Sequence, residues 1–172
     1  MSRLLHAALV ALLLALVAGV THPAPAAAFD RVVNETTLFR LVNHARVQQG
    51  LRPLLFAEPL RRAALSHSRD MLAHDYFGHS SLGGAGIGAR ARRAGYASGG
   101  LSSVTVGEVI AWGKSYRGSP QSVFRNWMRS GIHRHVILSS RWRDVGIGCV
   151  RGTYRGICGA IMYTVDFGRR AQ

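Results

Sequence analysis

The sequence is poor in carboxylates and cysteine, and it has almost no lysine. Of 172 residues, 8 are Asp or Glu and 2 are Cys. Glutamate occurs only at Glu35, Glu58 and Glu108, and Lys114 is the one lysine. Two cysteines cannot complete a closed zinc site, which usually has four protein ligands. A carboxylate inside an apolar stretch is costly to bury unless it has a partner, and Glu108 lies in such a stretch.

Several common catalytic motifs are also missing. The sequence has no G-x-S-x-G pattern, which supplies the nucleophile of α/β-hydrolases. It has no H-E-x-x-H pattern, the zinc-binding helix of many peptidases. The stretch Gly107 to Ser115 resembles a phosphate-binding loop, but five residues separate its glycines where the pattern requires four. These absences exclude the standard forms of α/β-hydrolases, H-E-x-x-H zinc peptidases and nucleotide-binding proteins with a phosphate-binding loop.

The N-terminus has the features of a secretory signal peptide. A short basic start precedes an apolar run from Leu4 to Val20, and Ala26-Ala27-Ala28 fits a small-residue cleavage site. The alternative is an uncleaved membrane anchor, but 17 apolar residues are at the low edge for spanning a bilayer. The sequence therefore predicts a signal peptide at 1–28 and a secreted, extracellular single domain at 29–172.

The predicted mature chain is strongly basic. The formal net charge is +14, and cleavage after Ala28 removes only Arg3, which leaves +13. Such a charge attracts polyanions, so acidic cell-envelope polymers or lipid head groups are the expected partners. The arginines are scattered and no aromatic–basic array is present, so no nucleic-acid partner is expected.

An equally simple origin of the high arginine content is the codon bias of a GC-rich genome. The oligomeric state stays open.

The two cysteines, Cys149 and Cys158, lie close together in a chain that is predicted to be exported. An even, close pair in such a chain typically forms a disulfide. Because the segment between them reads as a hairpin, the sequence predicts a cross-strand bridge.

Hydrophobic periodicity predicts helices before and between strands, and therefore an α+β fold with an antiparallel or mixed sheet. His67 lies on the apolar stripe of the second helix, so we expect it to be a core histidine. Helices are expected at 32–49, from 58 onward, at 87–94 and from 120 onward; strands are expected at 104–112, with a bend at Gly107-Glu108, at 145–150 and at 157–167.

Three side chains from separate places remain as candidate site residues: His79, Glu108 and His133. Two imidazoles and a carboxylate in one cleft are suitable ligands for a divalent metal such as Zn²⁺. The same groups also suit acid–base catalysis. A third alternative is a buried hydrogen-bond network that only stabilises the fold. Each residue follows a glycine by one or two positions, which favours placement next to glycine-containing loops.

The motifs around these residues, taken in order, resemble the CAP superfamily (SCP-like extracellular proteins) in its short bacterial form. The matching segments are Leu41-Val42-Asn43-His44-Ala45-Arg46, Gly50-Leu51-Arg52-Pro53-Leu54, Ala64-x-x-His67-Ser68-x-Asp70-Met71, Phe77-x-His79-Ser80, Gly107-Glu108-Val109-Ile110-Ala111, Trp127-Met128-x-Ser130-x-x-His133-Arg134, Val145-Gly146-Ile147-Gly148 and Tyr163-Thr164-x-Asp166-Phe167-Gly168.

The resemblance implies a three-layer α-β-α sandwich with a central, mostly antiparallel sheet. Many members have a His-Glu-Glu-His tetrad in a cleft, in which His79, Glu108 and His133 match three positions and Ser130 replaces the second Glu. Val109 replaces the usual Asn after Glu108. The implied function is a non-enzymatic extracellular binding domain whose His/Glu cleft holds Zn²⁺ or another divalent metal. The alternative is a metal-dependent hydrolase that uses His79, Glu108 and His133.

Overall fold

The computed structural model describes residues 29–96 and 103–171. The predicted signal peptide at 1–28 lies outside the described residues. The elements in chain order are α1 (Arg31–Gln48), β1 (Leu55–Phe56), α2 (Glu58–Ala73), α3 (Ile87–Arg93), β2 (Ser103–Lys114), a 3₁₀ turn (Ser115–Gly118), α4 (Pro120–Arg129), α5 (Gly131–Ile137), β3 (Asp144–Tyr154) and β4 (Ile157–Ala171).

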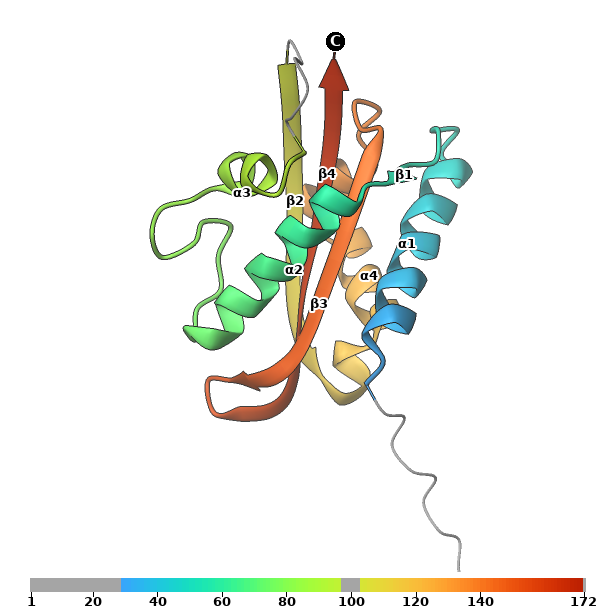
Figure 1. The fold of residues 1–172 in the computed structure, drawn as a ribbon. Helices are drawn as coiled ribbons and strands as arrows, with labels where there is room; N and C mark the ends of the chain where they lie inside the picture. Colours follow the sequence, from blue (N-terminus) through green and yellow to red (C-terminus); the bar gives the residue numbers. More distant parts are fainter. Residues whose placement is uncertain (1–28, 97–102, 172) are drawn as a thin grey trace, which may run out of the picture.

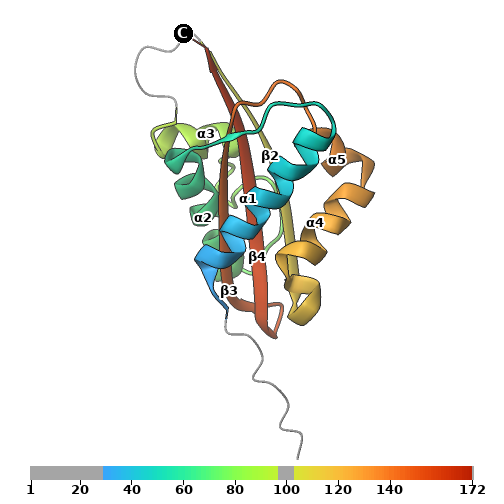
Figure 2. The same cartoon turned by 90° about the vertical axis from the view of Figure 1, so that its right-hand side faces the viewer.

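A four-stranded sheet forms the middle layer, in the order β1-β3-β4-β2. Strand β4 pairs antiparallel with both β2 and β3, while the short β1 pairs parallel with β3. Helices α2 and α3 cover one face, and α1, α4 and α5 cover the other (Figures 1 and 2). The predicted α+β sandwich with a mostly antiparallel sheet is confirmed.

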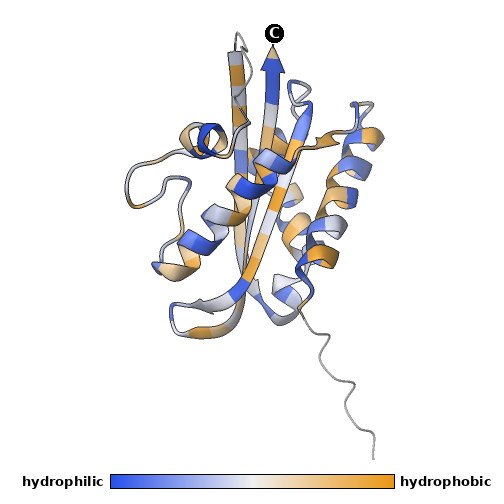
Figure 3. Cartoon of the chain, in the orientation of Figure 1, coloured by the Kyte–Doolittle hydropathy of each residue, from blue (hydrophilic) through white to orange (hydrophobic). Residues whose placement is uncertain are grey.

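The hydrophobic residues face inward from both outer layers. Along the helices hydrophilic and hydrophobic segments alternate, whereas in the middle of β3 hydrophobic segments alternate with pale ones of intermediate hydropathy (Figure 3). Val145, Ile147 and Cys149 of β3 are fully buried. In the part of the chain that the structure describes, no helix is long and apolar enough to cross a membrane.

Helix α2 packs unusually close to the sheet because two glycines of β3 face it. A Cβ added to Gly146 would lie 2.1 Å from the Arg61 backbone nitrogen, and one added to Gly148 would lie 2.2 Å from that of Leu65. No side chain fits at these distances, so the G-x-G pattern of β3 lets α2 rest directly on the strands. This contact brings His67 of α2 against the sheet.

Two polar side chains of α1 fix distant backbone segments. The Asn43 amide donates to the Leu54 carbonyl and accepts from the Leu54 N–H, at 3.0 and 2.7 Å. Arg46 is completely buried, and its Nη1 donates to the carbonyls of Ile137 and Ser139 at 2.8 and 2.9 Å. These carbonyls lie at and just beyond the end of α5, so Arg46 holds the helix that carries a candidate site residue.

The predicted bend at Gly107-Glu108 is wrong. Strand β2 runs unbroken, and every residue from Ser103 to Lys114 has a partner in β4. A Cβ on Gly107 would lie 2.6 Å from the ring of Trp142, so the glycine provides room for an indole. The neighbouring Glu108 points to the opposite face, because successive strand residues alternate.

The predicted disulfide is also wrong. Cys149 lies opposite Tyr163 in the ladder, whereas Cys158 lies opposite Thr153. Thr153 lies four positions further along β3 than Cys149, which is roughly 13 Å of strand, and cysteines that far apart cannot bond. Both cysteines are free, Cys149 buried and Cys158 exposed. The two strands are longer than the sequence suggested, and only Arg155 and Gly156 form the turn.

The difference in burial predicts two distinct thiol reactivities. A thiol reagent should modify Cys158 in the folded chain, while Cys149 should react only after unfolding, because burial also raises the pKa of its thiol. Thiol counting by mass spectrometry, with and without denaturant, measures this. The variant Cys158→Ser should show no modification when folded. If both thiols were unreactive even in denaturant and reacted only after reduction, the two cysteines would form a disulfide and this prediction would be wrong.

Candidate functional site

The three predicted site residues come from three elements. His79 lies in the segment between α2 and α3, Glu108 lies in β2, and His133 lies in α5. Only His79 is therefore outside regular secondary structure, and the expectation that all three adjoin loops does not hold. The sheet and a helix place the other two side chains.

His79 and Glu108 are in direct contact. The Nδ1 atom of His79 lies 2.7 Å from Oε1 of Glu108. The Glu108 side chain is 2% exposed and that of His79 is 61% exposed, so a buried carboxylate holds an imidazole that faces solvent. The hydrogen bond to Glu108 raises the pKa of His79. This geometry orients the ring through Nδ1 and leaves Nε2 for a ligand.

Arg90 of α3 is the residue that sequence reasoning missed. Its Nη2 donates to Oε2 of Glu108 at 2.5 Å, and its Nη1 donates to the carbonyls of His79 and Ala85, each at 2.9 Å. The Arg90 side chain is only 5% exposed. Burial by itself would raise the pKa of Glu108, but the hydrogen bond from His79 and the charge of Arg90 outweigh it and lower that pKa. Glu108 is thus held as a buried anion.

His67 of α2 lies beneath this pair and is 1% exposed, which confirms the prediction of a core histidine. Its Nε2 lies 2.8 Å from the Gly78 carbonyl and 4.0 Å from Oε2 of Glu108. Burial lowers the pKa of His67 despite the nearby carboxylate. A neutral ring that donates from Nε2 to Gly78 therefore fixes the loop residue next to His79.

His133 is held in a similar way by a different partner. Its Nδ1 lies 2.7 Å from Oγ of Ser130, the N-cap residue that precedes α5. Burial, and then the charge of His79, lower the pKa of His133, so the two imidazoles are close enough to influence each other. Ser130 thus performs for His133 the orienting role that Glu108 performs for His79, but without a negative charge.

A second acid, Asp166 of β4, lies next to Glu108 on the neighbouring strand. The two are directly opposite in the β2–β4 ladder, and Asp166 is completely buried. Neither carboxyl oxygen of Asp166 has a hydrogen-bond partner among the described residues. Burial, followed by the charge of Glu108, raises the pKa of Asp166 well above its usual range. Burial beside Glu108 therefore favours the protonated form of Asp166, and the strand register places the two carboxyl groups next to each other.

The imidazoles of His79 and His133 each have Nδ1 engaged, and neither Nε2 has a hydrogen-bond partner in the part of the chain that the structure describes. Within residues 29–96 and 103–171, no group of three or more His, Cys, Asp or Glu side chains is arranged to hold a metal ion. Both oxygens of Glu108 already accept hydrogen bonds, one from His79 and one from Arg90. As arranged, the carboxylate acts on His79 and does not itself face an open position.

The sequence model of the family described as "CAP: Cysteine-rich secretory protein family" matches residues 39–167, about three quarters of the chain. This range contains every residue of the site. The chain belongs to the CAP family.

Two Bacillus subtilis proteins are similar in sequence. The uncharacterized protein YkwD is 34% identical over 128 residues, which cover 74% of this chain and 45% of YkwD. The uncharacterized membrane protein YlbC is 30% identical over 124 residues, 72% of this chain and 34% of YlbC. The chain therefore spans less than half the length of either relative.

Solved structures share the fold. An extracellular protein containing a SCP domain from Bacillus anthracis is 26% identical, with a TM-score of 0.66 over 81% of this chain and 41% of that one. An outer surface protein from Borrelia burgdorferi is 16% identical, with a TM-score of 0.69 over 83% of this chain and 96% of that one. The second likeness concerns the fold alone.

The buried ion pair predicts a large stability loss for Glu108→Gln. This change leaves the Arg90 guanidinium buried without its counter-ion, which typically costs about 3–5 kcal/mol of unfolding free energy. Asp166→Asn is the matched control on the same face. It should cost far less, because burial and the neighbouring Glu108 raise the pKa of Asp166 and so favour its neutral form. Urea unfolding measures both.

A double-mutant cycle tests whether the cost comes from the pair. Glu108→Gln combined with Arg90→Met should lose clearly less than the sum of the single losses, because no charge is left uncompensated. Additive losses would show that Glu108 and Arg90 act independently.

The contact with Glu108 also predicts a pH dependence. Because the folded state raises the pKa of His79 above its ordinary 6.5, the stabilisation is fully present below that value. It is lost as the pH rises through the folded-state pKa. NMR titration of the His79 ring should give a value above 6.5, and a lower one in Glu108→Gln under conditions where that variant is folded. A value at or below 6.5 in the parent chain would contradict the interaction.

Proposed function

We propose that this chain is a secreted, non-enzymatic binding domain whose cleft holds a divalent metal such as Zn²⁺ between His79 and His133. The observation that carries the proposal is the matched anchoring of the two imidazoles. Each ring has its Nδ1 engaged, by Glu108 in one case and by Ser130 in the other. When Nδ1–H donates, the Nε2 lone pair is directed to a ligand.

The donor set suits zinc. Metal-bound histidines usually donate their other N–H to a carboxylate or another oxygen acceptor, which fixes the ring and increases its basicity. Glu108 is such a carboxylate, and Arg90 keeps it ionised and in place. His79 and His133 would be the protein ligands and Glu108 an outer partner, with water completing the coordination.

A binding role fits this chemistry better than hydrolysis. Catalytic zinc commonly has three protein ligands and a bound water. If Glu108 were the third ligand, its oxygens would have to leave His79 and Arg90, and a buried guanidinium would lose its partner. We therefore assign Glu108 a positioning role and do not favour the metal-dependent hydrolase.

The charge supports anionic partners outside the cell, such as acidic envelope polymers or lipid head groups. The formal net charge of +13 on the predicted mature chain gives the domain a field that attracts polyanions and weakens with salt. The similar Bacillus anthracis protein is described as extracellular, which agrees with secretion. In this reading the predicted signal peptide at 1–28 directs export.

Zinc titration by calorimetry tests the metal proposal. At about pH 7.5, where an ordinary imidazole is mostly neutral, the chain should bind one Zn²⁺, and His133→Ala should remove most of the binding heat. His135→Ala is the matched control, because this exposed histidine lies two positions further along α5. Equal loss in both variants, or no uptake by the parent chain, would refute the assignment.

Replacing Ser130, the uncharged partner of His133, with a carboxylate should increase the affinity for Zn²⁺. Ser130→Glu supplies a carboxylate next to His133, and outer partners of this kind change metal affinity by roughly 10- to 100-fold. We expect tighter Zn²⁺ binding in Ser130→Glu than in the parent, measured in the same titration. Unchanged affinity would show that Ser130 does not orient the metal-binding ring.

A further inference from the structure

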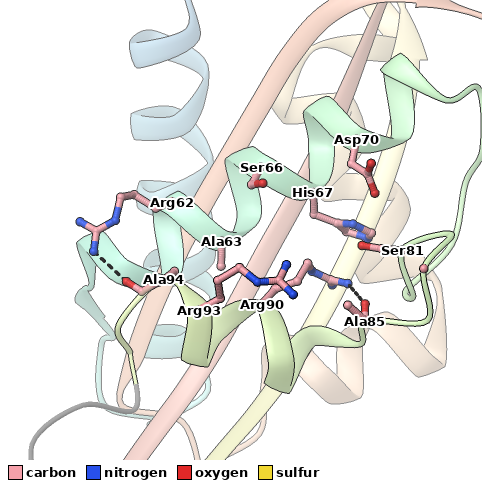
Figure 4. A pocket seen from close by; sticks show the side chains of 11 residues that line it. Arg62, Ala63, Ser66, His67, Asp70, Ser81, Ala85, Arg90, Arg93 and Ala94 are labelled. Carbon is pink, nitrogen blue, oxygen red and sulfur yellow. Dashed lines mark hydrogen bonds between the residues drawn. The ribbon is translucent and has the colours of Figure 1, made fainter.

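A cavity of about 520 Å³ opens between α2 and α3, beside the site described above. In Figure 4 the side chains of Arg90 and Arg93 extend from α3 into the space beside α2, and Arg62 flanks it from α2. Two serine hydroxyls, His67 and Asp70 complete the polar part of the wall. The cavity is therefore lined mainly by hydrogen-bond donors, and most of its charge is positive.

The wall carries three guanidinium groups and one carboxylate. The carboxylate of Asp70 is already occupied, because it accepts a hydrogen bond from Tyr76 and lies 2.9 Å from Nδ1 of His74. Within residues 29–96 and 103–171, the hydrogen bond that Arg62 donates goes to a neutral group, the Ala94 carbonyl, at 2.7 Å. Among the described residues, no ion pair includes Arg62 or Arg93. The cavity therefore has positive charge that the fold does not neutralise.

Arg90 supplies a second, independent indication of a ligand. Its Nε is buried and has no hydrogen-bond partner within the described part of the chain, although the side chain is only 5% exposed. A buried N–H without an acceptor is costly, so such groups in folded proteins usually meet water or a ligand. An acceptor oxygen in this cavity would relieve the cost.

We propose that this cavity binds a phosphate group carried on a glycerol- or sugar-sized unit, with Arg62 and Arg93 as its main contacts. Guanidinium groups present paired N–H donors that match the oxygens of a phosphate. The inference rests on the proposed role in binding anionic envelope material, and it locates that recognition away from His79 and His133. Arg90 lines the cavity and also holds Glu108, so the two sites are neighbours that share one side chain.

The size of the cavity favours a substituted phosphate over a bare ion. Ligand sites typically measure roughly 300–1,000 Å³, and this cavity lies within that range. Ala63, Ala85 and Ala94 add small apolar surfaces to the wall. A glycerol or sugar moiety could lie against them while the arginines hold the phosphate.

The test compares two double variants with the same change in charge. Arg62→Gln/Arg93→Gln removes one guanidinium from each side of the cavity. The control Arg69→Gln/Arg92→Gln removes one exposed arginine from α2 and one from α3, at positions that do not line the cavity. All four arginines are exposed, so both variants should fold, which thermal unfolding verifies. The probe is glycerol 3-phosphate in calorimetry at roughly 150 mM NaCl, where long-range attraction is screened.

The parent chain and the control should bind glycerol 3-phosphate with affinities within about twofold of each other. The cavity variant should bind about 10-fold more weakly or worse, because it loses charged hydrogen bonds. Glycerol should not bind, and inorganic phosphate should bind more weakly than glycerol 3-phosphate. Equal weakening in the two double variants would overturn the proposal, since general charge attraction would then explain the binding. No binding by the parent chain would also overturn it.

Two further probes show whether the phosphate belongs to a polymer or to a lipid. They also distinguish failure of the cavity proposal from failure of the proposed function. Soluble poly(glycerol phosphate) represents an envelope polymer, and phosphatidylglycerol vesicles represent a lipid surface. Whichever source is correct, its binding should be lost in Arg62→Gln/Arg93→Gln and kept in the control. Polymer or vesicle binding that survives in the cavity variant would refute the cavity while leaving the proposed function intact. No binding to either by the parent chain would refute the anionic partner, and zinc uptake would still test the metal site separately.

Discussion

The ion pair between Glu108 and Arg90 is the interaction on which the arrangement of the site depends. Both side chains are almost completely buried, and each would be costly without the other. Arg90 also binds the carbonyls of His79 and Ala85, so one guanidinium joins β2, α3 and the segment between α2 and α3. The exposed imidazole of His79 therefore has a defined orientation although it lies outside regular secondary structure.

The sheet makes this ion pair possible by providing an enclosed face. Gly146 and Gly148 let α2 lie directly on β3, which brings His67 to the carboxylate and covers it from water. In this dry environment two acids face each other across β2 and β4, and they cannot both ionise cheaply. Arg90 and His79 contact Glu108, so Glu108 takes the charge and Asp166 remains neutral.

Hydrophobic periodicity was sufficient for the α+β architecture. That His79 and Glu108 share a site is what the family resemblance of the ordered motifs implies, and the two side chains are in contact. Arg90 was missed because one arginine among many carries no local signal, and its partner lies 18 residues away. The predicted bend at Gly107 is wrong because this glycine makes room for the Trp142 ring and does not interrupt the strand. The disulfide failed because it depends on hairpin register, and residue spacing does not determine register.

The unequal partners of the two histidines determine how the site responds to charge. Glu108 gives His79 a full negative charge, whereas Ser130 gives His133 only a dipole. A cation between the rings would therefore be bound more firmly from the His79 side, and Arg90 would oppose it from behind Glu108. An anion in the cavity between α2 and α3 would offset part of the Arg90 charge and so favour the cation. Because binding free energies are reciprocal, a cation at His79 would favour the anion to the same extent.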